Sequence, residues 1–255
     1  MNSILQFTCR ANSRYISSDI RRVVRQRSRF GCCVCGCPII EYHHITPYSE
    51  GGEHTVENLI ALCPTCHKRA DKEGSWSVDQ VRKFGDSPYN TDTTKDRFLI
   101  DSSDFVVRLG WIEFRNCSQL VALGKRIVLE SRRMDDGIIL VSGYFQDEEG
   151  NPIAKIVENE WRILTDSVWD VEFLNASRLT VRVGPGRVAL KMRITGNVLE
   201  VQQCFFRDSH ARLFLRGDDK STNMKIEASG NTRFRSRNER IVIEGPFGAP
   251  ALILN

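Results

Sequence analysis

The sequence has no apolar run that approaches the length needed to cross a bilayer, and its start does not resemble a secretion signal. The opening stretch MNSILQFTCRANSRY lacks a charged start, a continuous apolar core and a small-residue cleavage site. Hydrophobic residues at 41% and charged residues at 27% exclude a disordered chain and an integral membrane protein. We therefore expect a cytoplasmic protein with no membrane partner, long enough at 255 residues to bury one or two cores.

Histidine is scarce, yet three of the five histidines lie in two short stretches. YHHITP places His43 and His44 side by side, and LCPTCHKR places His67 directly after a Cys-x-x-Cys. Six of the nine cysteines lie in the same region, between positions 32 and 66. In a reducing compartment such a cluster favours metal binding over disulfides. The other three cysteines are expected to be buried structural thiols: Cys9, Cys117 and Cys204.

The net charge of +4 is modest, but it is unevenly distributed. Residues 1–30 contain seven arginines and one acid, Asp19. The segment YISSDIRRVVRQRSRFG predicts a short helix that Ser17 or Ser18 caps and Gly31 ends, with its arginines pointing outward. The arginines indicate a solvated helix face or, if a nucleic-acid site adjoins them, a phosphate-binding surface.

The region that carries the cysteines and histidines alternates short strands and helices. EYHHIT and NLIAL suit strands, and the loop between them contains Gly51 and Gly52, which tolerate unusual backbone angles. PTCHKRADKEG predicts a helix with Pro64 in its first turn and Gly74 at its end. SVDQVRKF (77–84) predicts one more helix.

The character of the sequence changes after this region. Residues 85–102 are rich in turn formers and lack periodicity, which predicts a linker. Residues 103–255 contain short alternating stretches separated by turns, which are typical of an all-β domain: a sandwich, a barrel or a solenoid. We therefore expect two domains, at 1–84 and 103–255. The second could recognise DNA, sense a regulatory ligand or assemble a homo-oligomer.

Two Cys-x-x-Cys pairs have the spacing of a structural zinc site. Cys32 and Cys35 form the first pair, and Cys63 and Cys66 form the second. Two such pairs complete a tetrahedron of thiolates, which closes the zinc shell and leaves no open position for catalysis. Free thiols that happen to cluster are the alternative.

The histidines are then available for a different role. On a strand, His43 and His44 face opposite sides, so one can bind a metal while the other faces another atom. His67 lies about 100° around its helix from Cys66, so the helix can hold zinc with one face and present an imidazole from another. Two imidazoles suit an open divalent-metal site, and Asn58 could orient a histidine ring.

These residues resemble the HNH endonuclease family, whose domain has a ββα-metal fold. The likeness rests on C-x2-C, then HHITP, GG, ENLIAL and C-x2-CH, over residues 17–75. It implies that His43 and His67 bind the catalytic ion, that His44 is the general base and that Asn58 positions the base or its loop. It also implies that the four cysteines form the zinc knuckle, and that the preceding arginine helix leads into the domain. His54 is expected to be a loop contact, with a role in the site as the alternative.

The chemistry that this resemblance implies is hydrolysis of a phosphodiester bond in DNA, which we expect to be double-stranded. The catalytic ion would be Mg²⁺ or Mn²⁺, with Ni²⁺ or Zn²⁺ as alternatives. A restriction or anti-phage role is an analogy. The alternative function is a non-catalytic, zinc-finger-like nucleic-acid-binding protein, which would not need the histidines. The expected DNA contacts are basic residues near the site: Arg21, Arg22, Arg25, Arg29, Lys68 and Arg69.

Overall fold

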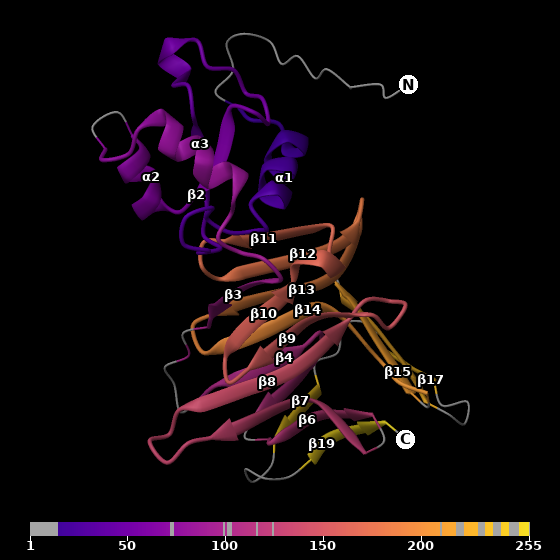
Figure 1. Cartoon of the computed structure of the whole chain (residues 1–255). Helices are drawn as coiled ribbons and strands as arrows, with labels where there is room; N and C mark the ends of the chain where they lie inside the picture. The colour runs from indigo at the N-terminus through magenta and orange to yellow at the C-terminus, as the bar shows by residue number, and fades with distance from the viewer. Residues whose placement is uncertain are drawn as a thin grey trace, which may run out of the picture. The chain divides into compact units, whose positions relative to one another are not determined.

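The computed structural model describes residues 15–71, 74–98, 100, 104–115, 117–123, 125–209, 211–217, 222–228, 233–236, 241–244 and 250–254. The chain divides into two compact units (Figure 1). The N-terminal unit comprises Met1–Gly36 and Ile40–Asn90, and the β unit comprises Cys37–Ile39 and Thr91–Asn255. Cys9, Arg10 and Arg14 lie outside the described residues.

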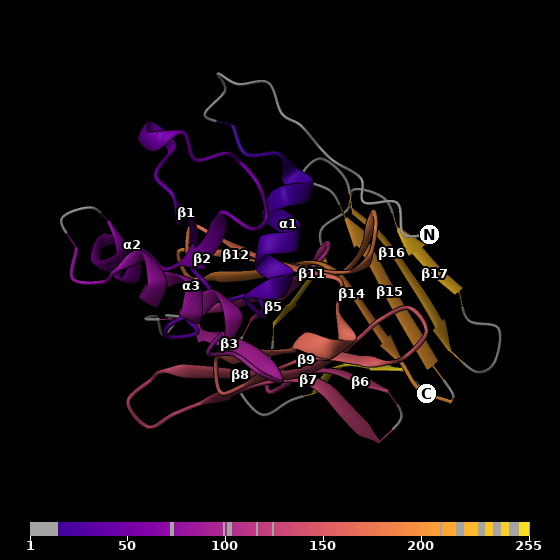
Figure 2. The ribbon, with the colours of Figure 1, turned by 45° about the horizontal axis from the view of Figure 1, so that its top comes forward.

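The N-terminal unit consists of a two-stranded hairpin with helices around it (Figure 2). Its elements are α1 (Ser18–Arg27), β1 (Glu41–His44), the 3-10 turn η1 (Tyr48–Glu50), β2 (Leu59–Leu62), α2 (Pro64–Ala70) and α3 (Val78–Asp86). Strands β1 and β2 are antiparallel, with His43 opposite Ile60 and His44 opposite Leu59. The predicted strand pair and helices are therefore present.

Helix α1 packs its apolar stripe against β2. Ile20 and Val24 form a buried cluster with Leu59 and Ala61. The helix starts where the Ser17 hydroxyl accepts a hydrogen bond from the Ile20 amide at 3.4 Å, as a capping serine should. It ends at residue 27 and not at the predicted glycine, because residues 29 and 30 take positive φ angles of 52° and 60°.

Part of the expected linker at 85–102 has regular structure. Helix α3 continues to Asp86, and β3 (Thr93–Arg97) pairs with β10 (Glu160–Leu164) of the β unit. The sequence TTKDR does not look like a strand because it contains no apolar residue. In the structure Thr94 is nevertheless fully buried on one face, and the other face is polar. The linker prediction is therefore wrong over these residues.

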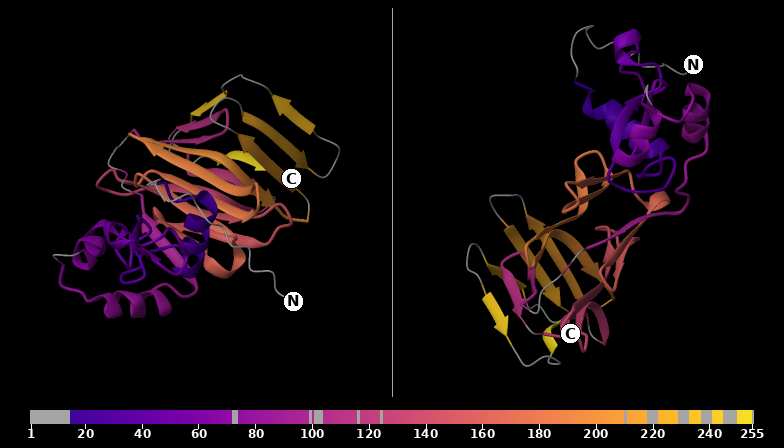
Figure 3. Two further views of the ribbon diagram at one scale, coloured as in Figure 1. Left: turned by 90° about the horizontal axis from the view of Figure 1, so that it is seen from above. Right: turned by 90° about the vertical axis from the view of Figure 1, so that its left-hand side faces the viewer.

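The β unit is built of strands, and its described part has no α-helix (Figure 3). Besides β3, β10 and the 3-10 turn η2 (Thr165–Ser167), its elements are β4 (Val106–Leu109), β5 (Ile112–Arg115), β6 (Gln119–Leu123), β7 (Arg126–Arg133), β8 (Ile139–Gln146), β9 (Pro152–Val157), β11 (Asp170–Leu174), β12 (Arg178–Gly184), β13 (Arg187–Thr195), β14 (Val198–Arg207), β15 (Ala211–Gly217), β16 (Thr222–Ala228), β17 (Arg233–Ser236), β18 (Ile241–Glu244) and β19 (Pro250–Leu254).

Strand β14 belongs to two sheets. Its first half pairs with β13 and, in parallel, with β4, whereas its second half pairs with β15 and meets β8. One sheet runs β11-β12-β13-β14-β4-β5-β18. The other contains β3-β10-β9-β8-β7-β6-β19 together with β14-β15-β16-β17. The predicted all-β domain is confirmed as a large, mostly antiparallel half-barrel.

Side chains alternate between the two faces of these strands, as the sequence pattern predicts. The inward face is apolar, and its largest side chains, such as Trp161, Phe145 and Phe206, are fully buried. Cys117 and Cys204 are also buried, as expected, and burial raises the pKa of the Cys204 thiol. In the described parts of the chain, no helix has the length and apolarity that a bilayer crossing requires.

Candidate functional site

Four cysteines converge where the segment after α1 meets the start of α2. Their sulfur atoms all lie within 4.8 Å of one another, with 3.7 Å between Cys35 and Cys63 and 3.9 Å between Cys35 and Cys66. Four thiolates at about 2.3 Å from a tetrahedral zinc lie about 3.8 Å apart. The cluster of Cys32, Cys35, Cys63 and Cys66 therefore fits a structural zinc ion.

The backbone at the start of α2 favours the thiolate form of Cys63, which is the form that binds metal. Cys63 is the N-cap residue, and its Sγ accepts a hydrogen bond from the Cys66 amide at 3.5 Å. Burial raises the pKa of Cys63, but this hydrogen bond and those from neighbouring thiols outweigh burial and lower it overall. Cys33 lies outside the cluster, and burial raises its pKa to about 12, which keeps it a protonated thiol.

A second group of metal-ligand type combines two histidines with a carboxylate. Ligand atoms of His43, His67 and Asp71 lie within 4.8 Å of one another. Asp71 Oδ1 is 3.7 Å from His43 Nδ1 and 3.7 Å from His67 Nε2, and the two imidazoles meet edge to face. Three ligands of this kind can hold a divalent ion and leave coordination positions open for water and substrate.

Sequence reasoning predicted the two histidines but missed the carboxylate. Asp71 directly follows α2, four residues after His67, and this spacing places both residues on one side of the helix. A His-x3-Asp spacing at the end of the predicted helix was the signal that could have identified it. The expected donor set of two imidazoles and no carboxylate is therefore incomplete.

The surroundings of His67 and His43 set the orientation of the first ring and the protonation of the second. Glu41, two residues before His43 on β1, accepts a hydrogen bond from His67 Nδ1 at 2.5 Å, which turns His67 Nε2 toward Asp71. Burial, aided by repulsion from His67, lowers the pKa of His43 to about 4. His43 is therefore neutral at physiological pH, as a metal ligand must be.

His44 faces away from this group, as the strand alternation predicts. Its Nε2 lies 2.8 Å from Nδ1 of His54, and the His54 ring stacks on Tyr48 with 5.1 Å between centroids. Burial, together with repulsion from His54 and His67, lowers the pKa of His44. His54, for which a loop contact was expected and a site role was the alternative, thus touches the candidate base directly.

Asn58 holds the loop between β1 and β2 through hydrogen bonds to its backbone. Its side chain accepts from the Thr46 amide at 2.7 Å and donates to the carbonyls of Thr46 and Glu53, both at 3.1 Å. Only glycine fits at position 52, because a Cβ there would lie 1.9 Å from the Thr46 carbonyl oxygen. Of the two alternatives for Asn58, the geometry favours positioning of the loop.

The basic residues near the site differ in exposure. Arg25 is buried and donates to the Tyr42 hydroxyl at 2.7 Å, so the expectation that it points outward is wrong. Arg22 pairs with Asp19 at 2.6 Å. Of the other four predicted contacts, two on α1 and its end are partly exposed and two on α2 are exposed: Arg21, Arg29, Lys68 and Arg69.

Comparison with known proteins agrees with this geometry. Residues 32–73, which include both ligand groups, match the family described as HNH endonuclease. Residues 32–73 therefore form an HNH endonuclease domain. The predicted resemblance is therefore confirmed for the HNH domain.

Two relatives align with this part of the chain. Over 33 residues the chain is 52% identical to the type IV methyl-directed restriction enzyme EcoKMcrA of Escherichia coli K12. This alignment covers 13% of the chain and 12% of that enzyme. Over 72 residues the chain is 46% identical to anaredoxin of Nostoc sp. PCC 7120. This alignment covers 28% of the chain and 92% of that protein. No solved structure matches the chain.

The placement of Asp71 predicts that this carboxylate is a ligand of the divalent ion. Asp71→Asn should weaken Mn²⁺ binding at least about 10-fold, because a neutral amide replaces the one anionic donor in the group. Titration calorimetry on full-length protein measures this, with the zinc content unchanged. Asp79→Asn is the matched control, since Asp79 is exposed on α3 and belongs to neither ligand group. Equal Mn²⁺ affinity in wild type and Asp71→Asn would contradict the assignment.

Proposed function

We propose that the protein is a metal-dependent endonuclease that hydrolyses phosphodiester bonds in DNA. One observation carries the proposal: adjacent residues of β1 point to opposite sides, one into the His43, His67 and Asp71 group and the other, His44, toward His54. This arrangement supplies a divalent-ion site and a general base within one residue of each other. A zinc-binding module without catalysis would need neither.

The chain's own residues would divide the work between binding and proton transfer. His43, His67 and Asp71 would hold Mg²⁺ or Mn²⁺, with Ni²⁺ or Zn²⁺ as alternatives that imidazole ligands accept. Such an ion, when bound, polarises a phosphate oxygen and stabilises the leaving 3′ oxygen. The four cysteines would hold zinc and keep α2 against the hairpin, so that His67 faces His43.

His44 would remove the proton from the attacking water. The 2.8 Å contact leaves room for one hydrogen between His44 Nε2 and His54 Nδ1. If His44 donates this hydrogen, its Nδ1 keeps a lone pair and can accept the proton of water. The lowered pKa of His44 supports this role, since the base must be neutral before the reaction.

The wider parts of the proposal rest on the relatives and the composition. The restriction enzyme among them supports DNA as the substrate and a role in restriction or antiviral defence. We extend the proposal to double-stranded DNA, to the cytoplasm and to a division of labour in which residues 1–84 cut and residues 103–255 recognise, sense or assemble. The arginines at positions 21, 22 and 29, with Lys68 and Arg69, remain proposed phosphate contacts.

The general-base role predicts the effect of one substitution. His44→Ala should lower the rate of plasmid cleavage with added Mn²⁺ by about 10²- to 10⁴-fold, the usual contribution of a positioned base. Zinc content and Mn²⁺ affinity should match wild type, because His44 lies outside both ligand groups. A wild-type cleavage rate in the folded variant would exclude His44 as the base.

The contact between His44 and His54 predicts a different outcome for two substitutions at one position. His54→Leu should lower kcat by about 10- to 100-fold with little change in KM, because His44 loses its acceptor. His54→Asn should stay within a few-fold of wild type, since its Oδ1 can accept in place of Nδ1. Both variants lose the stacking on Tyr48, so equal activities in the two would show that the hydrogen bond is unimportant.

A further inference from the structure

Four side chains form one row across the β8, β9, β10 and β3 strands of the β unit. The strand register places Tyr144 opposite Lys155, Lys155 opposite Arg162 and Arg162 opposite Lys95. Residues directly opposite each other in a sheet project from the same face. These side chains, which we call the basic row, are exposed or half-buried, with Tyr144 51% exposed.

The charges of the basic row are unfavourable for the fold itself. Like charges that lie directly opposite each other destabilise a sheet, and Arg162 has a lysine on each side. One carboxylate, Glu160, lies among them and pairs with Arg162 at 2.5 Å. That ion pair, with smaller contributions from Lys95 and Arg97, lowers the pKa of Glu160. The three cations of the basic row thus share one carboxylate, because Glu158 at the neighbouring turn pairs with Arg132.

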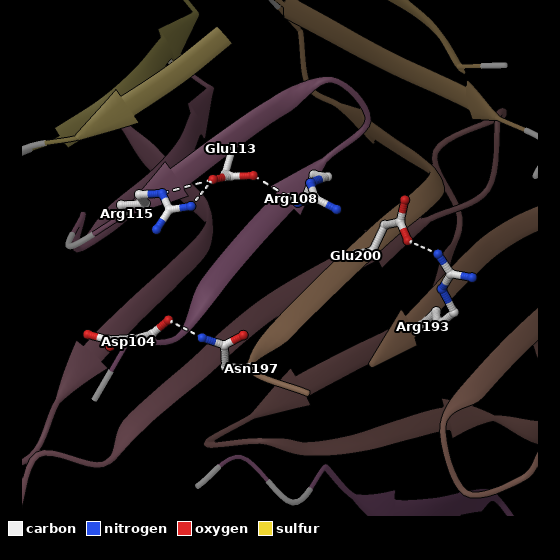
Figure 4. A network of polar contacts seen from close by, with 7 residues as sticks. All are labelled: Asp104, Arg108, Glu113, Arg115, Arg193, Asn197 and Glu200. Carbon is white, nitrogen blue, oxygen red and sulfur yellow. Dashed lines mark hydrogen bonds and ion pairs between the residues drawn. The ribbon is translucent and has the colours of Figure 1, made fainter. Parts of the chain in front are cut away.

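The other sheet of the β unit carries a row in which the charges alternate. From β13 to β5 the register aligns Arg193, Glu200, Arg108 and Glu113 (Figure 4). Arg193 pairs with Glu200 at 2.6 Å, and Arg108 pairs with Glu113 at 2.8 Å. Arg178 on β12 adds a single cation opposite Arg193. Arg115 on β5 shares Glu113 with Arg108, so each arginine of this row from β13 to β5 contacts a carboxylate, whereas the three cations of the basic row lie around one carboxylate, Glu160.

The chemistry of the basic row fits a polyanion. Neighbouring strands lie about 4.8 Å apart, so the three cations from β3 to β9 span about 10 Å, which is between the widths of the minor and major grooves of DNA. Lysine and arginine bind phosphate, and an exposed tyrosine at the end of the row can donate to a phosphate or stack on a base. Binding of an anion would relieve the repulsion between the opposed cations.

We propose that the basic row of Lys95, Arg162, Lys155 and Tyr144 binds the phosphate backbone of duplex DNA. This inference rests on the proposed function for its choice of partner, because it gives the β unit a part in holding the substrate that the HNH domain cuts. Its evidence is separate, since it comes from the register and charges of the β unit alone.

The test is equilibrium binding of full-length protein to a fluorescent DNA duplex without added divalent ions, measured over a range of salt concentrations. The variant Lys95→Gln/Lys155→Gln/Arg162→Gln should bind at least about 10-fold more weakly at 100 mM salt, with the slope of log affinity against log salt reduced by about 2 to 3. Arg187→Gln/Arg193→Gln/Arg216→Gln removes the same charge from exposed or half-buried positions outside the row and should stay within about 2-fold of wild type.

The outcomes separate this inference from the proposed function. An unchanged affinity and salt slope in the first variant would overturn it, as would an equal loss in both variants, which would indicate net charge alone. Binding to vesicles that contain an anionic phospholipid, but not to duplex DNA, would also overturn it. A protein that binds duplex through the row but cuts no DNA would contradict only the proposed function. A protein that cuts DNA while the row leaves affinity unaffected would contradict only this inference.

Discussion

The four-thiolate cluster is the constraint on which the candidate site depends. Cys32 and Cys35 follow α1, whereas Cys63 and Cys66 begin α2, so a shared zinc ion would join segments about thirty residues apart in sequence. The unit around it is small, with one short hairpin and a buried cluster centred on Ile20, Val24, Leu59 and Ala61. A core of this size gains much of its stability from a metal. A zinc ion bound here would fix the start of α2, and with it the direction of His67 and Asp71.

The hairpin places the histidines of β1 on its two sides. Alternation along β1 sends Glu41 and His43 to the side of α2, where Glu41 orients His67, and sends His44 to the side of the loop. The loop is in turn held by Asn58, which bonds backbone groups at both of its ends. One side of the strand therefore carries residues of metal-ligand type, and the other carries the His44 imidazole, which contacts His54. His43 and His44 are neutral in the physiological range, because burial lowers the pKa of each imidazole.

Sequence reasoning succeeded where the spacing of residues determines geometry, and failed where tertiary contacts do. Cys-x2-C spacing and strand alternation were enough to predict the thiolate cluster and the opposite directions of His43 and His44. Asp71 was missed because a single aspartate after a helix has no distinctive pattern until His43 lies beside it. Arg25 was misplaced because its burial depends on the Tyr42 hydroxyl, seventeen residues away. Strand β3 was missed because its outward face is polar, and its pairing with β10 is not visible locally.

The central claim is hydrolysis of DNA, and the ends of the products test it most directly. Supercoiled plasmid would be incubated with the zinc-loaded, full-length protein and Mn²⁺, and the nicked or linear products would then be treated with DNA ligase. The account predicts cleavage that requires the added ion and leaves 5′ phosphate and 3′ hydroxyl ends, which ligase can seal directly. Intact plasmid with every divalent ion tried, or ends that ligase cannot seal without prior repair, would contradict it.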